Sequence, residues 1–325
     1  MNILVTGAAG FIGMHVARAL LERGHSVVGL DNFNANLYPA ELKRARADQL
    51  RGRPGFTGVE GDLCDLERLN RVFAEGRFDA VCHLAAQPGV RYSLENPHAY
   101  ETANLLGFLN VLEACRHHQV PKLVYASSSS VYGGNTKLPF HEDDPVDHPV
   151  SLYAATKKAN ELMAHTYTHL FGFQTIGLRF FTVYGPWGRP DMAVWSFSKA
   201  MLEGRPIRVF NHGDMQRDFT YIDDIRAGVV SCLEATNLDR YEILNIGNHR
   251  PENLLDMIAT LAGALGVQPK LEMHPMQPGD VPATYADITR IHDKLGFEPT
   301  TPISIGFPRF ARWYLAWREG RILEN

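Results

Sequence analysis

The sequence is poor in cysteine, and its few cysteines form no metal-binding pattern. Four occur among 325 residues, at Cys64, Cys82, Cys115 and Cys232. No two of them are spaced as Cys-x-x-Cys, so we expect no zinc site and no other bound metal. Cys82 lies in an apolar run, where a small buried side chain is the ordinary interpretation. This cysteine usage predicts a reducing, cytoplasmic environment.

The sequence also lacks a segment suited to a membrane. No apolar run reaches the roughly 20 residues that a transmembrane helix needs. The N-terminus reads Met-Asn-Ile-Leu-Val-Thr-Gly and enters an apolar strand at once, without a basic leader or a cleavage site. We therefore expect no membrane partner.

No concentration of basic charge is visible. Lys and Arg number 32 against 36 Asp and Glu, which gives a net charge of −4. A nucleic-acid partner would require a concentrated basic face, so none is expected. The hydrophobic share of 45%, the charged share of 21% and the 28 dispersed glycines are typical of a globular α/β protein. The length predicts one large domain and a smaller second unit.

Short apolar runs alternate with helical segments through the first half of the chain. The apolar runs are Ile3–Thr6, Ser26–Leu30, Phe56–Val59, Ala80–Leu84, Lys122–Ala126 and Thr175–Leu178. Helical spacing marks Phe11–Arg23, Pro97–His117 and Leu152–Phe171. This alternation predicts an α/β fold built on a doubly wound parallel sheet.

The pattern changes after about Thr182. Proline and glycine cluster at Tyr184–Pro190 and Pro275–Pro282, as in loop-rich units that cap a nucleotide domain and hold its substrate. Asp223–Glu234 and Glu242–Asn245 resemble a helix and a strand that return to the main sheet. We expect a nucleotide-binding domain over residues 1–183, joined by 223–250. A smaller, mixed α/β substrate domain is expected over residues 184–222 and 251–325.

Three glycines after the first predicted strand form the clearest binding motif. Gly7, Gly10 and Gly13 allow a tight turn and close approach to a pyrophosphate, and the helix N-terminus offers free N–H groups to its charge. Asp31 ends the second strand, where a carboxylate can bind both ribose hydroxyls and repel a 2′-phosphate. The motif therefore predicts NAD rather than NADP. A turn residue before Asn32 is the alternative for Asp31.

Tyr153 and Lys157 form a candidate catalytic pair. Four residues apart, they share one face of a helix. A tyrosine of ordinary pKa, about 10, is a poor base at neutral pH. A nearby ammonium and a positive nicotinamide ring favour the phenolate, which then accepts a proton from a sugar hydroxyl as hydride leaves the same carbon. Lys157 is also expected to bind the nicotinamide ribose. The alternative is a solvated surface pair, which is what this spacing gives by chance in many helices.

The spacing Gly-x-x-Gly-x-x-Gly resembles the extended short-chain dehydrogenase/reductase superfamily, which implies a Rossmann-type domain. The resemblance implies that Ser128 completes the triad with Tyr153 and Lys157. It also places Asp62 at the adenine and Asn104 in a helix that supports the active site. The cofactor-binding residues that it implies are Gly7, Gly10, Phe11, Ile12, Gly13, Asp31, Asn32, Asp62, Leu63, Leu84, Ala85, Ala86, Asn104, Ser127, Tyr153, Lys157 and Phe180.

Two longer segments resemble the UDP-glucuronate 4-epimerase family. These are Val146–Glu161 and Arg179–Ala193, and the resemblance runs from Met1 to the last helix. Nucleotide-sugar dehydratases and UDP-glucuronate decarboxylases carry acids after the triad residue, whereas this chain has Ser129 and Ser130, which speaks against a dehydratase. UDP-galactose 4-epimerases usually carry Asn where Thr182 stands, which favours a uronic acid over a neutral hexose.

The substrate site follows from the same resemblance and from the charge of a uronate. Hydroxyl groups after the fifth and sixth strands can hydrogen-bond the carboxylate, and Arg189 can neutralise it or tie down its glycine-rich loop. Arg91 is a weaker candidate, and Gln277 stands where galactose epimerases carry a second diphosphate arginine. The substrate-binding residues that we expect are Ser128, Ser129, Ser130, Tyr153, Phe181, Thr182, Arg189, Phe210, Arg217 and Asp280.

The resemblance thus implies an NAD-dependent isomerase that interconverts UDP-glucuronate and UDP-galacturonate through a transient 4-keto sugar. UDP-galactose epimerisation and UDP-glucuronate decarboxylation on the same scaffold are the alternatives. A non-catalytic NAD-binding sensor is a minor one, because sensors on this fold often lose the Tyr/Lys pair. A homodimer is also implied, with Pro97–His117 and Leu152–Phe171 as candidate interface helices.

Overall fold

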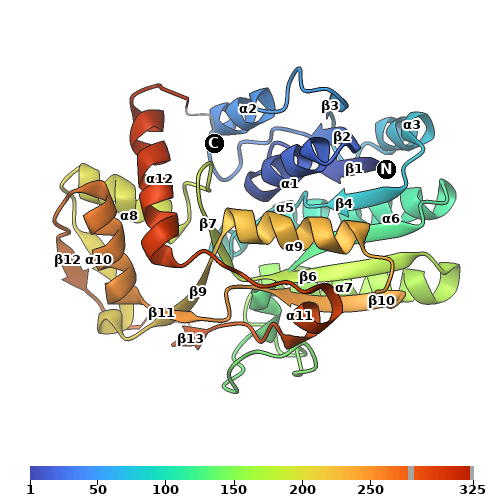
Figure 1. Cartoon of the computed structure of the whole chain (residues 1–325). Coiled ribbons are helices and arrows are strands. Elements are labelled where there is room, and N and C mark those ends of the chain that lie inside the picture. The colour runs from blue at the N-terminus through green and yellow to red at the C-terminus, as the bar shows by residue number, and fades with distance from the viewer. Residues whose placement is uncertain (277–281, 323–325) are drawn as a thin grey trace.

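The computed structural model describes residues 1–276 and 282–322, and its centre is a seven-stranded parallel sheet (Figure 1). The strand order is β10-β6-β5-β4-β1-β2-β3. The strands are β1 (Asn2–Thr6), β2 (Ser26–Asp31), β3 (Phe56–Glu60), β4 (Ala80–His83), β5 (Lys122–Ser128), β6 (Gln174–Phe180) and β10 (Tyr241–Ile246). The order reverses between β1 and β4, which makes their carboxyl ends the expected binding crevice of a doubly wound sheet. The predicted fold class is confirmed.

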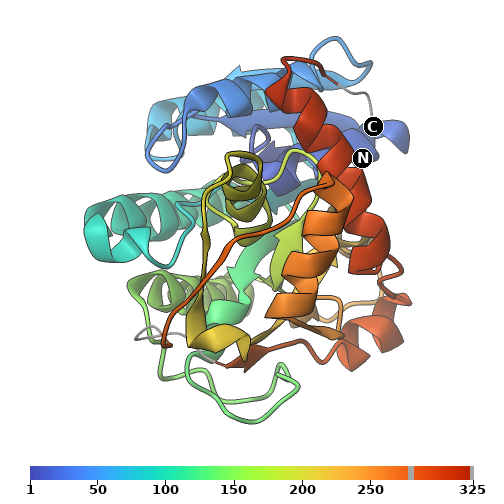
Figure 2. The same cartoon turned by 90° about the vertical axis from the view of Figure 1, so that its left-hand side faces the viewer.

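Helices cover both faces of this sheet (Figures 1 and 2). One face carries α1 (Phe11–Glu22) and α9 (Ile222–Glu234), which pack against each other. The other carries α3 (Leu66–Gly76), α6 (Gly107–His117) and α7 (Leu152–Phe171). The central strands β1 and β4 are therefore almost wholly buried, which explains why they read as continuous apolar runs.

Two helix boundaries follow from local sequence signals. Ser151 caps α7, because its hydroxyl accepts a hydrogen bond of 3.1 Å from the N–H of Ala154. The helix ends at Gly172, whose φ of +78° is the left-handed conformation that glycine adopts without strain. These signals define where α7 begins and ends, and they place Tyr153 in its first turn.

The predicted helix Pro97–His117 is helical throughout but not uniform. It consists of α5 (Pro97–Tyr100), a π-helical segment η1 (Glu101–Leu106) and α6. Short π-helical segments widen the helix and often occur at functional sites. Here the wider turn contains the buried Asn104, whose contacts reach the pocket described below.

Strand β10 lies at one edge of the main sheet and pairs in parallel with β6. The other described strands from Thr182 onward are not part of this sheet. That remainder contains a four-stranded sheet of β7 (Thr182–Tyr184), β9 (Gln216–Tyr221), β11 (Pro251–Asn253) and β13 (Ala283–Thr284). A two-stranded sheet joins β8 (Ile207–Val209) to β12 (Leu271–Met273).

Helices complete the C-terminal part of the chain. Its helices are α8 (Ala193–Leu202), α10 (Leu254–Leu265), α11 (Thr289–Leu295) and α12 (Ile303–Arg318). α10 packs on both α8 and α12 (Figure 1). In the part of the chain that the structure describes, no helix has the length and apolar character required to cross a membrane.

Candidate active site

A cavity of about 780 Å³ opens at the carboxyl ends of the parallel strands. Its wall is formed by the turns after β1, β2, β4 and β5 and by the segment from Phe180 to Val183. This is the crevice where the strand order reverses, so the fold itself places the cavity. Most of the residues expected to bind cofactor or substrate line it.

The glycine-rich turn lies against the opposite strand end and leaves no room for side chains. Gly7 has a φ of +72°, and a Cβ there would lie 2.7 Å from the backbone nitrogen of Ala85. At Gly13 a Cβ would lie 2.0 Å from the carbonyl oxygen of Gly7. Glycine is therefore required at both positions. The packing brings the N-terminus of α1 to the cavity, where its free N–H groups can hold a pyrophosphate.

Hydrogen bonds hold the polar side chains of Asp31 and Asn32, at the end of β2, and of Asp62, after β3, in place. Asp31 is buried, and its two oxygens accept from the N–H groups of Ala9 (3.0 Å) and Phe33 (2.9 Å). Asn32 donates to Asp62 at 2.7 Å. The hydrogen bonds from Cys64 and Asn32 hold the pKa of Asp62 below its usual range, although burial acts in the other direction. Both carboxylates line the cavity and can accept hydrogen bonds from an adenosine.

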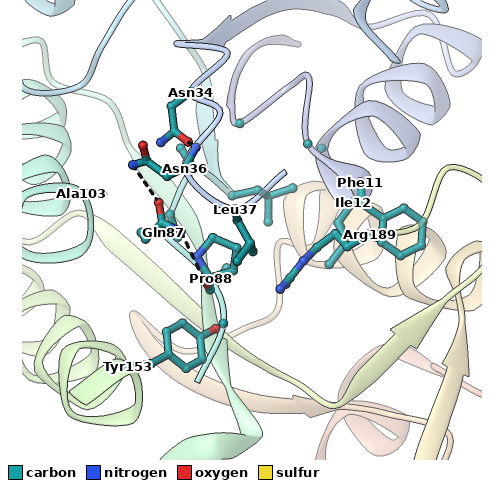
Figure 3. A pocket seen from close by; sticks show the side chains of 18 of the residues that line it. Phe11, Ile12, Asn34, Asn36, Leu37, Gln87, Pro88, Ala103, Tyr153 and Arg189 are labelled. Carbon is teal, nitrogen blue, oxygen red and sulfur yellow. Dashed lines mark hydrogen bonds between the residues drawn. The ribbon is translucent and has the colours of Figure 1, made fainter. Parts of the chain in front are cut away.

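Gln87 is a cavity residue that the sequence did not indicate as a ligand. Its backbone N–H donates to the side chain of Asn104 at 2.8 Å, and Asn104 donates back to the Gln87 carbonyl at 3.1 Å. Figure 3 shows its side chain facing Asn36, which donates to it at 3.4 Å. Asn104 itself lies behind the cavity wall and also donates to Thr156 at 3.1 Å. The only sequence signal for Gln87 is its place directly after the predicted strand-end segment His83–Ala86.

Ser128, Tyr153 and Lys157 meet at one side of the cavity. The ammonium of Lys157 donates to the carbonyl of Ala126 at 2.9 Å, and burial lowers the pKa of this lysine to about 8. Burial raises the pKa of Tyr153, while a hydrogen bond with Ser128 and the charge of Arg189 oppose that rise. The ring of Tyr153 packs edge-on against Tyr100, with centroids 6.1 Å apart. The triad expected from the sequence is therefore a contiguous group, and Arg189 is an additional electrostatic neighbour.

The serine run after β5 divides into two environments. Ser127 is buried, and its hydroxyl donates to Glu161 at 2.7 Å, so this hydroxyl is engaged away from a ligand. Ser129 and Ser130 begin the 3₁₀ turn η2 (Ser129–Tyr132) and line the cavity. Ser128 organises this turn by accepting a hydrogen bond of 3.2 Å from the N–H of Ser130.

The segment after β6, which adjoins β5 in the sheet, brings Phe180, Phe181 and Thr182 to the cavity, and Arg189 also lines it. Arg189 pairs with Asp191 through two hydrogen bonds, one of them 3.1 Å long from Nε. Burial alone would lower the pKa of Arg189, but the carboxylate of Asp191 outweighs it and the pKa is raised. Figure 3 shows the guanidinium of Arg189 and the phenol of Tyr153 directed into the same space. The geometry is consistent with both expectations for Arg189, a carboxylate contact and a loop tie.

Two expected substrate residues do not line the cavity. Phe210 belongs to the short 3₁₀ segment η3 (Phe210–Gly213), where its ring lies between Arg91, at 5.8 Å, and the ring of His274, at 5.6 Å. Arg217, on β9, donates to the carbonyl of Gln216 at 2.8 Å and that of Pro282 at 3.1 Å. Asp280 and Gln277 lie outside the residues that the structure describes.

The sheet topology, the glycine turn and the Ser/Tyr/Lys group define a dinucleotide-binding protein of the extended short-chain dehydrogenase/reductase class. The sequence model described as "NAD dependent epimerase/dehydratase family" matches residues 3–247. The chain belongs to this family, which confirms the resemblance seen in the sequence.

The chain is similar to nucleotide-sugar 4-epimerases of known name or structure. UDP-glucuronate 4-epimerase 4 of Arabidopsis thaliana is 48% identical over 336 residues, covering 98% of this chain and 76% of its own. The crystal structure of UDP-glucuronic acid 4-epimerase from Bacillus cereus, in complex with UDP-glucuronic acid and NAD, matches with a TM-score of 0.91. It is 37% identical and covers 98% of this chain and 100% of that one. The UDP-glucose 4-epimerase of Thermus thermophilus, in complex with NAD, matches with a TM-score of 0.85 at 31% identity, covering 97% of this chain and 99% of that one.

Proposed function

We propose that this protein is a UDP-glucuronate 4-epimerase that interconverts UDP-glucuronate and UDP-galacturonate. The observation that carries the proposal is the juxtaposition of Tyr153 with a cluster of hydroxyl groups and a partly buried arginine in one cavity. The cluster consists of Ser129, Ser130 and Thr182, with Arg189 beside it. Hydroxyls and a guanidinium are suited to a carboxylate, whereas a neutral hexose requires no cation. The relatives named above support the same assignment.

NAD fits the glycine-lined part of the cavity, because Gly7, Gly10 and Gly13 line it and the N-terminus of α1 opens onto it, where free N–H groups can hold a pyrophosphate. We propose that the residues expected from the sequence hold it, with Asp31 at a ribose and Asp62 at the adenine, and we add Gln87. When bound, NAD supplies the chemistry of accepting hydride from carbon 4 of the sugar and returning it. Return of that hydride to the opposite face of carbon 4 would leave the bound NAD unchanged, so none would be consumed.

Tyr153 is the proposed acid and base. Its phenolate removes the proton of the 4-hydroxyl group as hydride leaves carbon 4. Its phenol returns the proton after the 4-keto sugar has rotated about its link to the diphosphate and presents its other face. Ser128 stabilises the phenolate by hydrogen bonding, and the charge of Arg189 lowers the pKa of Tyr153 in the same sense. Lys157, anchored to Ala126, holds the nicotinamide ribose.

The hydroxyl cluster has a second proposed role, which is to prevent decarboxylation. The 4-keto intermediate of a uronate is a β-keto acid and loses carbon dioxide when its carboxylate bond aligns with the ketone π system. Hydrogen bonds from Ser129, Ser130 and Thr182 hold the carboxylate out of that alignment. Thr182→Ala and Ser129→Ala are expected to release UDP-4-keto-pentose during turnover. If neither variant forms a decarboxylated product, the hydroxyl cluster does not control this reaction.

The nucleotide half of the substrate is assigned to the C-terminal part of the chain. We propose that Phe210 lies at the uracil, that Arg217 binds the diphosphate and that Asp280 binds the ribose. This assignment divides the chain into a cofactor part, residues 1–183 and 223–250, and a nucleotide-sugar part, residues 184–222 and 251–325. The parallel pairing of β10 with β6 supports the first of these units.

The test is incubation of the purified protein with UDP-glucuronate, without added NAD, followed by proton NMR. We expect UDP-galacturonate to form up to a fixed ratio. We expect Tyr153→Phe to lose about 10²- to 10⁴-fold in rate, which is what general acid–base catalysis contributes. UDP-xylose or a keto-pentose as the main product would identify a decarboxylase. Turnover of UDP-galactose alone would identify the neutral-sugar epimerase, and no turnover of either would favour the sensor.

We also propose a homodimer formed through α6 and α7. The outer faces of these helices expose Leu109, Leu162, Leu170 and Phe171, with Leu162 57% and Leu170 62% accessible. Several large apolar side chains on adjoining helices are typical of an interface. Leu162→Glu is expected to halve the mass measured by light scattering, whereas Leu66→Glu, at an equally exposed leucine on α3, is expected to leave it unchanged.

A cytoplasmic location is proposed from the thiols. All four cysteines are free, and Cys82, Cys115 and Cys232 are buried. Free buried thiols are typical of reducing compartments.

A further inference from the structure

Arg46 is a wholly buried cation on α2 (Ala40–Asp48), a mostly polar helix in which Leu42 is the other buried residue. Burying a charge is unfavourable unless hydrogen bonds or an opposite charge compensate it. Among the described residues, no carboxylate forms an ion pair with Arg46, and its hydrogen-bond partners are all neutral oxygens. The unfavourable burial of this charge is explained by the segments that its hydrogen bonds hold together.

The guanidinium of Arg46 joins three segments of the cavity wall. Its Nη1 donates to the phenol oxygen of Tyr38 at 2.9 Å and reaches the carbonyl of Ala9, in the glycine-rich turn, at 3.5 Å. Its Nε donates to the carbonyl of Trp187 at 2.9 Å, and its Nη2 donates to the carbonyl of Gly188 at 2.8 Å. The last two carbonyls directly precede Arg189. One planar side chain thus connects the cofactor turn with the backbone that carries the cavity arginine.

The turn before Arg189 is strained and needs such support. Trp187 has a φ of +65°, in the left-handed region that a bulky residue rarely adopts. Its side chain is buried between Trp313 and Trp317, with ring centroids 5.3 Å away in both cases. Unusual backbone conformations persist where the surrounding structure fixes them, and here the indole packing and the two Arg46 bonds do so.

We propose that Arg46 is a positioning residue that fixes Arg189 opposite Tyr153 by binding the two carbonyls before it and tying them to the cofactor turn. The inference rests on the proposed role of Arg189 at the substrate carboxylate. It goes beyond that role because Arg46 itself touches neither substrate nor reacting atoms. The requirement is for geometry rather than charge. Arg46 makes four hydrogen bonds from one planar group, whereas a lysine has only three N–H donors on a single nitrogen.

A double-mutant cycle tests the positioning role. Arg46→Lys, Arg189→Lys and the double variant are compared with the wild-type holoenzyme for kcat/KM on UDP-glucuronate. Misplacement of a binding group by about 1 Å costs up to about 100-fold, so we expect Arg46→Lys to lose about 10- to 100-fold. Because the loss acts through Arg189, the double variant is expected to be no worse than Arg189→Lys alone. Arg44→Lys, at an exposed position of the same helix, is the matched control and is expected to retain full activity.

Multiplying losses in the double variant would show that Arg46 acts independently of Arg189 and would overturn the inference. If Arg46→Lys fails to fold, Arg46→Ala replaces it, with guanidinium chloride at millimolar concentration as a chemical rescue. Rescue of kcat/KM in Arg46→Ala, and not in Arg189→Ala/Arg46→Ala, would support the positioning role. A failure to rescue a folded, cofactor-loaded Arg46→Ala would count against it.

A second measurement does not depend on the proposed activity. The four tryptophans of the chain are Trp187, Trp195, Trp313 and Trp317, and they form one contacting cluster. Their fluorescence therefore reports the docking of the turn before Arg189. We expect a red-shifted emission in Arg46→Lys and none in Arg44→Lys. An unchanged spectrum would refute the positioning role even if UDP-glucuronate proves not to be the substrate, whereas a shift without turnover by the wild type would refute only the proposed function.

Discussion

Two buried histidines make the stability of this protein sensitive to mild acid. Burial lowers the pKa of both His15 and His83 from the ordinary 6.5 to about 3. His15 shares a hydrogen bond of 3.1 Å with the carbonyl of Pro186, and His83 shares one of 2.8 Å with the hydroxyl of Thr6. Both side chains are therefore neutral in the folded protein at any pH at which the unfolded chain begins to protonate them.

The sign and size of the effect follow from these values. Between pH 6.5 and pH 3 the unfolded chain binds a proton at each histidine that the folded protein does not, so stability falls as the pH falls through this window. At pH 5 the loss is about 2 kcal/mol for each histidine relative to pH 7.5, because each pH unit below the unfolded pKa contributes about 1.4 kcal/mol. The two together account for about 4 kcal/mol, a large part of the stability of a typical domain.

The assay is urea unfolding at pH 7.5 and pH 5.0 with NAD in constant excess. His83→Asn preserves a polar atom near the position of Nδ1, and His15→Gln preserves one near Nε2. We expect the stability difference between the two pH values to shrink by about 2 kcal/mol in each variant. His292→Asn, at an exposed histidine, is the control for the loss of a histidine as such. If the variants remain as sensitive to acid as the wild type, the buried histidines do not carry the effect and the reasoning is wrong.

Three further outcomes are expected at the site and beneath it. Gly13→Ala should abolish retention of NAD on gel filtration, because its Cβ would lie 2.0 Å from the carbonyl oxygen of Gly7; normal retention would contradict this packing. Glu161→Gln should lower the free energy of unfolding by about 3 kcal/mol, since it leaves the buried Arg179 without its ion pair; a loss under about 1 kcal/mol in urea titration would show that the pair is dispensable. The rate of epimerisation should fall as the pH rises through about 8, where Lys157 loses its charge; a rate that is flat to about pH 9.5 would separate that charge from catalysis.

The main sheet and the glycine turn were predictable because their signals are local. The central strands are buried on both faces and read as short apolar runs, and Gly7, Gly10 and Gly13 mark positions where a Cβ has no room. The pairing of Tyr153 with Lys157 follows from helical spacing alone. In each case neighbouring residues in the sequence carry the information, so no knowledge of distant segments was needed.

The remaining features depend on contacts between distant segments. The π-helical turn at Glu101–Leu106 has no signature in its own residues, because it serves the bonds that Asn104 makes to Gln87 and Thr156. Arg46 carries no signal in its own segment, because two of its hydrogen-bond partners lie 141 and 142 residues away in the sequence. Ser127 was predicted among the cofactor-binding residues and lines the cavity, but its hydrogen bond to Glu161, 34 residues further along the chain, has no signal in the sequence.

The buried bases around the cavity give the site a charge that changes little with pH. His15 and His83 are neutral down to a pKa of about 3, and the two arginines, Arg46 and Arg189, keep their protons at all accessible pH values. In the turn before Arg189, the carbonyl of Pro186 accepts a hydrogen bond from the neutral His15. The next two carbonyls, of Trp187 and Gly188, accept from the cationic Arg46. A substrate that carries a diphosphate and a carboxylate is anionic throughout this range. Arg189, the arginine that lines the cavity, keeps its charge throughout this range, which leaves Tyr153 and Lys157 as the groups whose titration sets the rate.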